Sequence, residues 1–306
     1  MEASTVRVGW IGLGTMGLEM ARNLQQHRAR TGQTPITVYN RTHAKCALVA
    51  EHGAHVAVSP ASIAQTCTVV FLSLRDDQAV KDIVTQLLDS IALETRDEPL
   101  LIADLTTVHP STTQWVLHKI SQANTKVRFC QTPVWGAPPA ARSANLVYVT
   151  SGSNSDSALL AEISVPAFAR TTIACDDPVR AAKFKIMGNF MIAGILETLG
   201  EAMAVAHESG ISRELYLEFV KAMFPVAPIL GYAHKMVDED GEASKTQVGF
   251  NIHGGMKDVG YAIDVAKSAG LDLPVAELAH KHLQWVLDNG DENWDWSSLA
   301  FALRKQ

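Results

Sequence analysis

The sequence predicts an α/β fold, a doubly wound parallel sheet over residues 1–176, followed by an all-α domain over residues 177–306 built on one long interdomain helix. Strand and helix patterns alternate through the first part, which is typical of parallel sheets covered by helices. One unbroken helical pattern then begins near residue 177. The composition, with 47% apolar and 19% charged residues among 306, provides enough apolar material for two cores.

Composition and charge also exclude several classes of function. A formal net charge of -6 argues against a nucleic-acid-binding surface. No stretch approaches the roughly 18 uncharged apolar residues of a membrane-spanning helix. The four cysteines lack metal-ligand or redox spacing, so we expect reduced thiols. The short polar segment Met1–Thr5 leaves no room for a targeting signal, which predicts a cytoplasmic protein.

The predicted sheet comes from short apolar runs that alternate with helical patterns. A parallel sheet with helices on both faces follows from this alternation. The expected strands are residues 6–11, 36–39, 67–74, 100–104, 127–131 and 145–151, and the clearest helices between them are residues 77–90 and 110–124.

A glycine-rich turn separates the first strand from the first helix. The segment Gly12-Leu13-Gly14-Thr15-Met16-Gly17 has the G-x-G-x-x-G spacing, and Met20, Ala21 and Leu24 continue it with helical periodicity. Gly12 permits a tight turn, Gly14 lets the backbone approach a pyrophosphate, and Gly17 allows close packing of the helix on the strand. Free N–H groups at the helix start would bind the phosphates. The sequence therefore predicts a Rossmann-type dinucleotide site formed by residues 12–17.

The end of the second strand indicates which dinucleotide is bound. An NAD site usually carries an acidic residue there to bind the ribose 2′-hydroxyl, but this chain has Asn40-Arg41-Thr42. A guanidinium suits a 2′-phosphate by charge and by its planar donor geometry. We therefore predict NADP(H) as cofactor, with Asn40, Arg41 and Thr42 among its contacts. A solvated loop arginine is the alternative interpretation of Arg41.

The second domain is predicted from a long helix. Asp177 is a candidate N-cap, Pro178 suits the first helical position, and the next stop signal is Gly210. Such a helix would be about 48 Å long and is apolar nearly all round. The other helical patterns, residues 213–223, 256–268 and 275–288, can hardly cover it alone. We therefore expect a homodimer formed through the helical domain.

The motifs together resemble the β-hydroxyacid dehydrogenases, the family of 3-hydroxyisobutyrate dehydrogenase and the glyoxylate/succinic semialdehyde reductases, with imine reductases as cousins. Motifs at positions 12, 41, 104, 133, 185 and 257 occur in the family's order over nearly the whole chain. The resemblance implies an NADP-dependent oxidoreductase acting on CH–OH and C=O groups, with a C-terminal domain like that of 6-phosphogluconate dehydrogenase.

The resemblance also implies site residues. The segment Asp104–Pro110 matches the family's D-x-S-T-x-x-P motif with Thr106 in place of serine, so Thr107 is an expected cofactor and substrate contact. Strand-end capping is the alternative role for Thr106 and Thr107. The family's F…KD segment matches Phe250 and Met256–Val259, which assigns Lys257 to the cofactor, with a surface ion pair to Asp258 as the alternative. We also place Leu74, the last residue of the strand 67–74, among the cofactor contacts.

The family's catalytic lysine lies four residues before an asparagine, and Lys185 and Asn189 reproduce this spacing. Residues at i and i+4 share one helix face, so both side chains would point together. Desolvation and the nearby nicotinamide charge would lower the pKa of Lys185 and suit it to proton transfer near neutral pH. Lys183 faces elsewhere and is expected to be structural or solvated. The alternative for Lys185 is a surface lysine.

The family's substrate loop, A-P-V-S-G-G, is the part from which this chain departs. Here the loop reads Thr132-Pro133-Val134-Trp135-Gly136-Ala137-Pro138-Pro139, with tryptophan in place of serine. A small carboxylate would lose hydroxyl and N–H donors, whereas an aromatic substrate would gain a flat wall. We expect Trp135, Gly136 and Ala137 to contact the substrate, together with Thr107, Lys185 and Asn189. Trp135 could instead be a packing residue.

Three functional hypotheses follow. The first is reduction of a carbonyl compound by NADPH, or the reverse reaction, with a small-molecule substrate and with Lys185 as general acid or base. The second is imine reduction of a bulkier substrate, which the altered loop favours and Lys185 disfavours. The third is a non-catalytic NADPH-binding scaffold, which the pair Lys185 and Asn189 disfavours. The histidines show no zinc-type spacing, so we expect no metal.

Overall fold

The computed structural model describes residues 6–93, 98–123, 126–238 and 240–303. The chain divides into two compact units, Met1–Lys185 and Ile186–Gln306, here called the N-terminal and C-terminal units. The division lies inside helix α8 (Pro178–Glu208), whereas the sequence analysis placed it between residues 176 and 177.

The main sheet of the N-terminal unit has six strands. Their spatial order is β3 (His55–Val56), β2 (Thr37–Tyr39), β1 (Val8–Ile11), β4 (Val69–Leu72), β5 (Leu100–Asp104) and β6 (Val127–Gln131). All paired strands are parallel. The order reverses between β1 and β4, and ligands bind at such a switch point, outside the carboxyl ends of the strands. This is the predicted doubly wound Rossmann arrangement.

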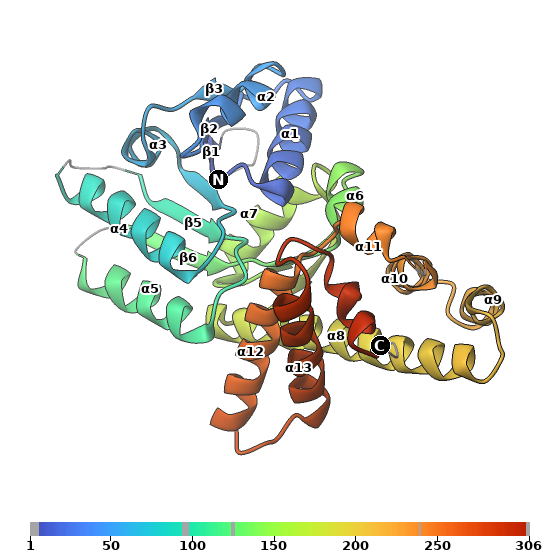
Figure 1. Ribbon diagram of the computed structural model, residues 1–306. Coiled ribbons are helices and arrows are strands. Elements are labelled where there is room, and N and C mark those ends of the chain that lie inside the picture. Colours follow the sequence, from blue (N-terminus) through green and yellow to red (C-terminus); the bar gives the residue numbers. More distant parts are fainter. Residues whose placement is uncertain (1–5, 94–97, 124–125, 239, 304–306) are drawn as a thin grey trace. The chain divides into compact units, whose positions relative to one another are not determined.

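Helices cover both faces of this sheet (Figure 1). Successive strand residues point to opposite faces, so Trp10 and Phe71 join one core and Ile11 and Leu72 the other. The first core is covered by α1 (Thr15–Arg30) and α7 (Asn154–Ser164), and the second by α3 (Pro60–Thr66), α4 (Asp77–Leu93) and α5 (Pro110–Gln122). The short helices η2 (His43–Cys46) and α2 (Ala47–Ala50) follow β2.

A second, smaller sheet was not expected. It has three strands in the order β7 (Val134–Trp135), β8 (Leu146–Thr150) and β9 (Ala169–Ala174), with α6 (Pro138–Arg142) between β7 and β8. β7 runs antiparallel and β9 parallel to β8. The strand expected over residues 145–151 therefore belongs to this sheet and not to the main one. The ring of Tyr148 on β8 packs on Phe168, which also contacts Trp10 and Phe71 of the first core.

The C-terminal unit is all helical, as predicted. After α8 come α9 (Arg213–Met223), α10 (Ala227–Val237), α11 (Glu242–Thr246), α12 (Ile252–Ser268), α13 (Pro274–Asn289) and the 3-10 segment η3 (Trp296–Leu303). The helices α10, α11 and η3 were not anticipated, and α12 begins four residues before the expected start at Met256. Leu196 and Met203 of α8 are buried in the core of this unit with Leu283 and Trp296.

Helix α8 corrects one expectation from the sequence. By length and composition it could cross a membrane, so the statement that no stretch approaches such a segment was wrong. A long core helix of a water-soluble protein meets the same criterion, and one such helix is weak evidence. Ala193, Leu196 and Leu199 of α8 pack in the core of the C-terminal unit. We therefore make no membrane assignment from this helix.

Candidate functional site

The glycine-rich turn between β1 and α1 has the geometry that its three glycines were expected to provide. Gly12 has φ +101°, and a Cβ there would lie 2.2 Å from the Ser73 carbonyl oxygen. A Cβ at Gly17 would lie 2.3 Å from the Gly12 carbonyl oxygen, so the helix packs closely on the turn. A Cβ at Gly14 would meet nothing within 4 Å. The turn is therefore tight at Gly12 and Gly17 and open at Gly14.

The open side of the turn coincides with the start of α1. Gly14 is the N-cap and provides no side chain to cap the helix, Thr15 is the first helical residue, and Met16 follows it half-buried. Leu13 is buried beneath the turn. Unpaired N–H groups at a helix start bind phosphate, and space at Gly14 admits it. These residues fit the pyrophosphate of a dinucleotide.

The segment after β2 is joined to this turn by hydrogen bonds. The Leu13 N–H donates to Asn40 Oδ1 at 2.9 Å, and Asn40 Nδ2 donates to the Thr42 carbonyl oxygen at 3.0 Å. Asn40 therefore fixes the glycine-rich turn against the loop that carries Arg41 and Thr42. Arg41 and Thr42 are exposed, and no acidic side chain precedes or follows Arg41 in the loop. The exposed guanidinium lies in the loop where the ribose of a dinucleotide is expected.

The loops after β4 and β5 form the next part of the site. The Leu74 N–H donates to Thr106 Oγ1 at 3.0 Å, and the Thr106 N–H donates to Asp104 Oδ1 at 3.0 Å. Thr106 thus has the strand-end role that was left open for it. Thr107 is half-buried beside it. The contact roles expected for Leu74 and Thr107 stay predictions.

A buried polar network supports these loops. Gln131 Nε2 donates to the carbonyl oxygens of Asp104 and Thr106 at 2.9 and 2.8 Å, and the Thr113 hydroxyl donates to Gln131 Oε1 at 3.1 Å. Burial raises the pKa of Asp104 to about 7, although the hydrogen bond from Thr106 opposes this shift. The sequence analysis missed Gln131 and Thr113. In the sequence, this network is indicated only by the polar residues Asp104 and Gln131 at the ends of the apolar strands β5 and β6.

Lys185 is buried at 8% exposure, which excludes the solvated surface lysine. Its Nζ lies 5.3 Å from the centroid of the Trp135 ring, and that ring packs edge-to-face on Phe184 at 4.9 Å. Lys183, by contrast, is exposed, as expected. The structure therefore brings together Lys185 and Trp135, two of the predicted site residues, through a cation–π contact.

The rest of the altered loop is shaped by backbone constraints. Gly136 has φ +136°, and a Cβ there would lie 2.5 Å from the Leu146 side chain, so only glycine fits. Ala137 is the N-cap of α6 and makes no side-chain cap hydrogen bond, and Pro138 begins the helix. Gly136 and Ala137 are exposed. This loop offers no hydroxyl where the family carries serine.

Two further predicted residues meet in the C-terminal unit. Asn189 Nδ2 donates to Asp258 Oδ2 at 2.5 Å, and Lys257 Nζ lies 3.0 Å from Asp258 Oδ1. Lys257 also lies 5.0 Å from the centroid of the Tyr261 ring. The ion pair considered as an alternative for Lys257 is therefore present, and its partner Asp258 is fully buried. The amide N–H₂ of Asn189 therefore faces the Asp258 carboxylate.

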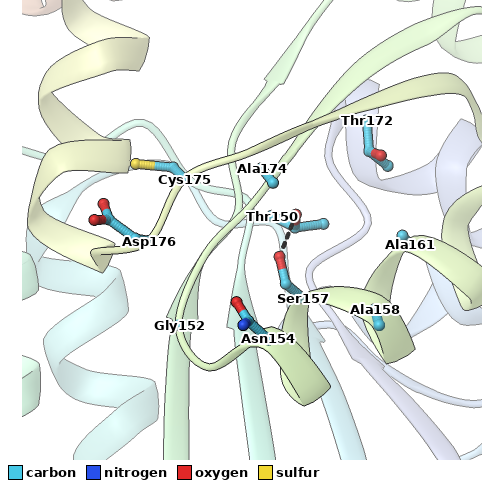
Figure 2. A pocket seen from close by; sticks show the side chains of 10 residues that line it. All are labelled: Thr150, Gly152, Asn154, Ser157, Ala158, Ala161, Thr172, Ala174, Cys175 and Asp176. Atoms are coloured by element: carbon cyan, nitrogen blue, oxygen red, sulfur yellow. Dashed lines mark hydrogen bonds between the residues drawn. The ribbon is translucent and has the colours of Figure 1, made fainter.

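A separate hollow of ≈ 400 Å³ contains none of the predicted site residues. It lies between α7 and the ends of β8 and β9, and Figure 2 shows the Ser157 hydroxyl directed at Thr150, with a separation of 2.5 Å. Small side chains and hydroxyl groups line most of it, and Asp176 adds one carboxylate. No group of three or more potential metal ligands occurs among the residues that the structure describes.

Comparisons with known proteins agree with this geometry. A family model described as the NAD binding domain of 6-phosphogluconate dehydrogenase matches residues 7–174. A second, described as the NAD-binding of NADP-dependent 3-hydroxyisobutyrate dehydrogenase, matches residues 180–303. The two matches cover the glycine-rich turn and the lysine helix respectively.

Individual relatives extend over almost the whole chain. Glyoxylate/succinic semialdehyde reductase 1 of Arabidopsis thaliana is 27% identical over 98% of this chain and 99% of its own length. An NADH-dependent oxidoreductase of Aspergillus ustus is 27% identical over 95% of this chain and 96% of its own. The structure of Mycobacterium tuberculosis 3-hydroxyisobutyrate dehydrogenase with L-serine aligns with a TM-score of 0.80 at 20% identity, covering 98% of this chain and 100% of that one. From the matching models and the relatives together, the chain belongs to the β-hydroxyacid dehydrogenase family and is an NAD(P)-binding oxidoreductase.

Proposed function

We propose that this chain is an NADPH-dependent oxidoreductase that interconverts a carbonyl compound and the corresponding alcohol, with Lys185 as the general acid and base. The observation that carries the proposal is the buried position of Lys185, 8% exposed, in the unit that also carries the glycine-rich turn. A solvent-exposed lysine would not support this assignment.

The chemistry assigned to Lys185 is proton transfer. NADPH, when bound at the glycine-rich turn, supplies the hydride. The Lys185 ammonium donates a proton to the carbonyl oxygen as that oxygen gains negative charge, and the neutral amine then recovers a proton from solvent. In the direction of oxidation, the neutral amine accepts the hydroxyl proton. A proton donor positioned in this way typically contributes about 10²–10⁴-fold to the rate.

Asn189 has a supporting role in this proposal. It lies one helical turn after Lys185 on α8, and i and i+4 side chains share a helix face. Asp258 holds its amide with the nitrogen toward the carboxylate and the oxygen turned away. A fixed amide oxygen orients either the lysine ammonium or a substrate hydroxyl. Lys257 is assigned to the cofactor, with the Asp258 ion pair fixing its side chain.

Arg41 supports the preference for NADPH. The guanidinium is exposed after β2, where an acidic side chain would bind the 2′-hydroxyl of NADH and repel a 2′-phosphate. A charge-assisted bond to a phosphate contributes about 2 kcal/mol. Arg41→Asp should therefore weaken NADPH binding at least about 10-fold more than NADH binding.

The cofactor experiment is a titration of the wild type and the variants with both nucleotides. The control is Arg170→Asp, which makes the same charge change at an exposed arginine on β9. It should leave the ratio of the two dissociation constants near that of the wild type. Equal weakening of NADPH and NADH by Arg41→Asp would show that Arg41 does not bind the 2′-phosphate.

The activity experiment is a panel of small aldehyde acids, bulky aryl aldehydes and cyclic imines, assayed by NADPH oxidation. Turnover of carbonyls supports the proposal. Turnover of imines alone would favour the second candidate, imine reduction, which the loop around Trp135 supports because it lacks the serine hydroxyl and presents an aromatic ring. Binding of NADPH without any turnover would favour the scaffold hypothesis.

We also propose that the chain forms a homodimer through its helical unit. Leu215, Phe219 and Met223 recur every four residues on α9 and are each about half exposed or more, at 62%, 47% and 60%. Such an apolar stripe is typical of a surface that a partner covers. Light scattering should give twice the chain mass, and Phe219→Glu should give the monomer. A monomeric wild type would exclude this assembly.

A further inference from the structure

Trp135 makes two ring contacts with consecutive residues of one helix. Its ring lies 5.3 Å from Lys185 Nζ and packs on the Phe184 ring at 4.9 Å, with the planes inclined by 78°. Phe184 and Lys185 belong to the second turn of α8, and Trp135 lies on β7. All three residues belong to the N-terminal unit. The ring therefore ties the lysine-bearing part of α8 to the loop that departs from the family pattern.

The ring has a direct effect on the lysine side chain. The face of an indole is electron-rich and attracts an ammonium group, more strongly when water is excluded. A lysine side chain otherwise loses much of its rotamer freedom when it is held in one place. A contact that restrains this side chain before substrate binds removes that loss from the catalytic step.

We propose that Trp135 is a positioning residue that holds the Lys185 ammonium in the place from which it transfers its proton. The inference rests on the proposed function for the role of Lys185, and on the ring contacts for the role of Trp135. In this chain the tryptophan thus replaces the family serine with a residue that acts on the lysine.

The structure provides a clean conservative variant. The Trp135 Nε1–H is buried and donates no hydrogen bond within the part of the chain that the structure describes. Trp135→Phe therefore keeps an aromatic face and breaks no hydrogen bond of the protein. Trp135→Leu keeps apolar volume but removes the ring. Phe184→Leu disturbs the same packing and leaves the indole beside the lysine, which makes it the control for packing alone.

The contact is tested first without substrate or cofactor. Acetylation of the free protein by acetic anhydride is followed by peptide mass spectrometry, and the rate at Lys185 is divided by the rate at exposed Lys183. The cation–π contact stabilises the ammonium relative to the reactive neutral amine, so Trp135→Leu should raise this ratio at least about threefold. Trp135→Phe and Phe184→Leu should leave the ratio within about twofold of the wild type.

Two outcomes would overturn the proposal. One is an unchanged ratio in folded Trp135→Leu, and the other is an equal rise in Trp135→Phe, which would mean that any change of the loop exposes the lysine. Melting curves of each variant verify that the ratio is measured on folded protein. If Trp135→Leu does not fold, Trp135→Met, which is longer and more adaptable than leucine but has no ring, takes its place.

A kinetic measurement separates positioning from substrate binding. With the best substrate of the carbonyl panel, Trp135→Leu should lower kcat about tenfold and change KM by less than about threefold, and Trp135→Phe should restore kcat. A loss of kcat in Lys185→Ala but not in Trp135→Leu would remove the role of Trp135 and leave the proposed function standing. Full activity in Lys185→Ala would remove the proposed function, while the acetylation ratio still decides whether the ring holds the lysine.

Discussion

The two units each bury an aspartate completely, but they satisfy it differently. In the N-terminal unit, Asp104 accepts one hydrogen bond from Thr106 two residues away, and Oδ2 has no partner among the described residues. In the C-terminal unit, Lys235 Nζ lies 2.8 Å from Asp295 Oδ2, across 60 residues of sequence. Asp104 is a local turn residue without a counter-ion, and Asp295 is the centre of a long-range ion pair.

The surroundings of Asp295 complete this contrast. The N–H groups of Gly249 and Phe250 donate to its Oδ2 at 2.7 and 3.2 Å, and the Ser297 hydroxyl donates to Oδ1 at 2.5 Å. Asp295 thus has a cation and several donors around it, whereas burial without such a cation favours the neutral form of Asp104. The helical unit therefore surrounds its buried aspartate with a cation and several donors, whereas the nucleotide-binding unit buries Asp104 at the cost of a raised pKa.

The largest expected effect comes from removing the ion pair. Asp295→Ala leaves the Lys235 ammonium, three backbone N–H groups and the Ser297 hydroxyl without their partner, and we expect a loss of about 5 kcal/mol in the free energy of unfolding. Urea unfolding followed by far-ultraviolet circular dichroism measures it. Asp295→Asn, which retains one acceptor oxygen, should lose less. A loss below about 1 kcal/mol in the alanine variant would show that the pair contributes little.

Asp104 should make stability depend on pH. Burial raises the pKa of Asp104 from 3.8 to about 7, so the folded state binds the proton more tightly than the unfolded state. The stability gained from this proton is complete below about pH 4 and is lost as the pH rises to about 7, a change of up to about 4 kcal/mol.

The matched variant is Asp104→Asn, which keeps the acceptor for the Thr106 N–H and cannot ionise. Denaturation at about pH 4 and about pH 8 should show less loss of stability with rising pH in the variant than in the wild type. Equal pH dependence in both proteins would mean that Asp104 is ionised at little cost in the folded state.

The smallest expected effect on stability distinguishes Gly17 from Gly14 in the glycine-rich turn. Gly17→Ala places a Cβ 2.3 Å from the Gly12 carbonyl oxygen, and we expect a loss of about 2 kcal/mol in unfolding free energy. Gly14→Ala meets nothing within 4 Å, so the free protein should unfold like the wild type. The new methyl group should instead weaken nucleotide binding, measured by titration. Similar stability losses in both variants would contradict the division of roles.

Local patterns allowed much of the N-terminal unit to be predicted. The strands 100–104 and 127–131 begin and end as expected, because each is a short segment rich in apolar residues between turn signals. The turn 12–17 was predictable because its backbone conformation and close contacts require glycine at Gly12 and Gly17. The second sheet was missed because β7 has only two residues. The connection from β7 to its partner β8 also contains the short helix α6, which hides the pairing in the sequence.

Contacts between distant residues could not be predicted. Nothing near Asn189 in sequence indicates Asp258, which lies 69 residues away, and nothing near Asp295 indicates Lys235. Trp135 was expected to face the substrate, and its contact with Lys185 depends on how β7 packs on α8. Periodicity identifies which face of a helix is buried but not which side chain of another element meets it.

Lys185 is the residue on which the proposed proton transfer depends, and the neighbouring Lys183 provides the control. NADPH oxidation with the best carbonyl substrate is compared in wild type, Lys185→Ala and Lys183→Ala, with NADPH binding measured in each. We expect Lys185→Ala to lower kcat by about 10²–10⁴-fold while binding NADPH normally, and Lys183→Ala to retain the wild-type rate. Turnover within a few-fold of the wild type in Lys185→Ala would contradict the assignment of Lys185 as the proton donor.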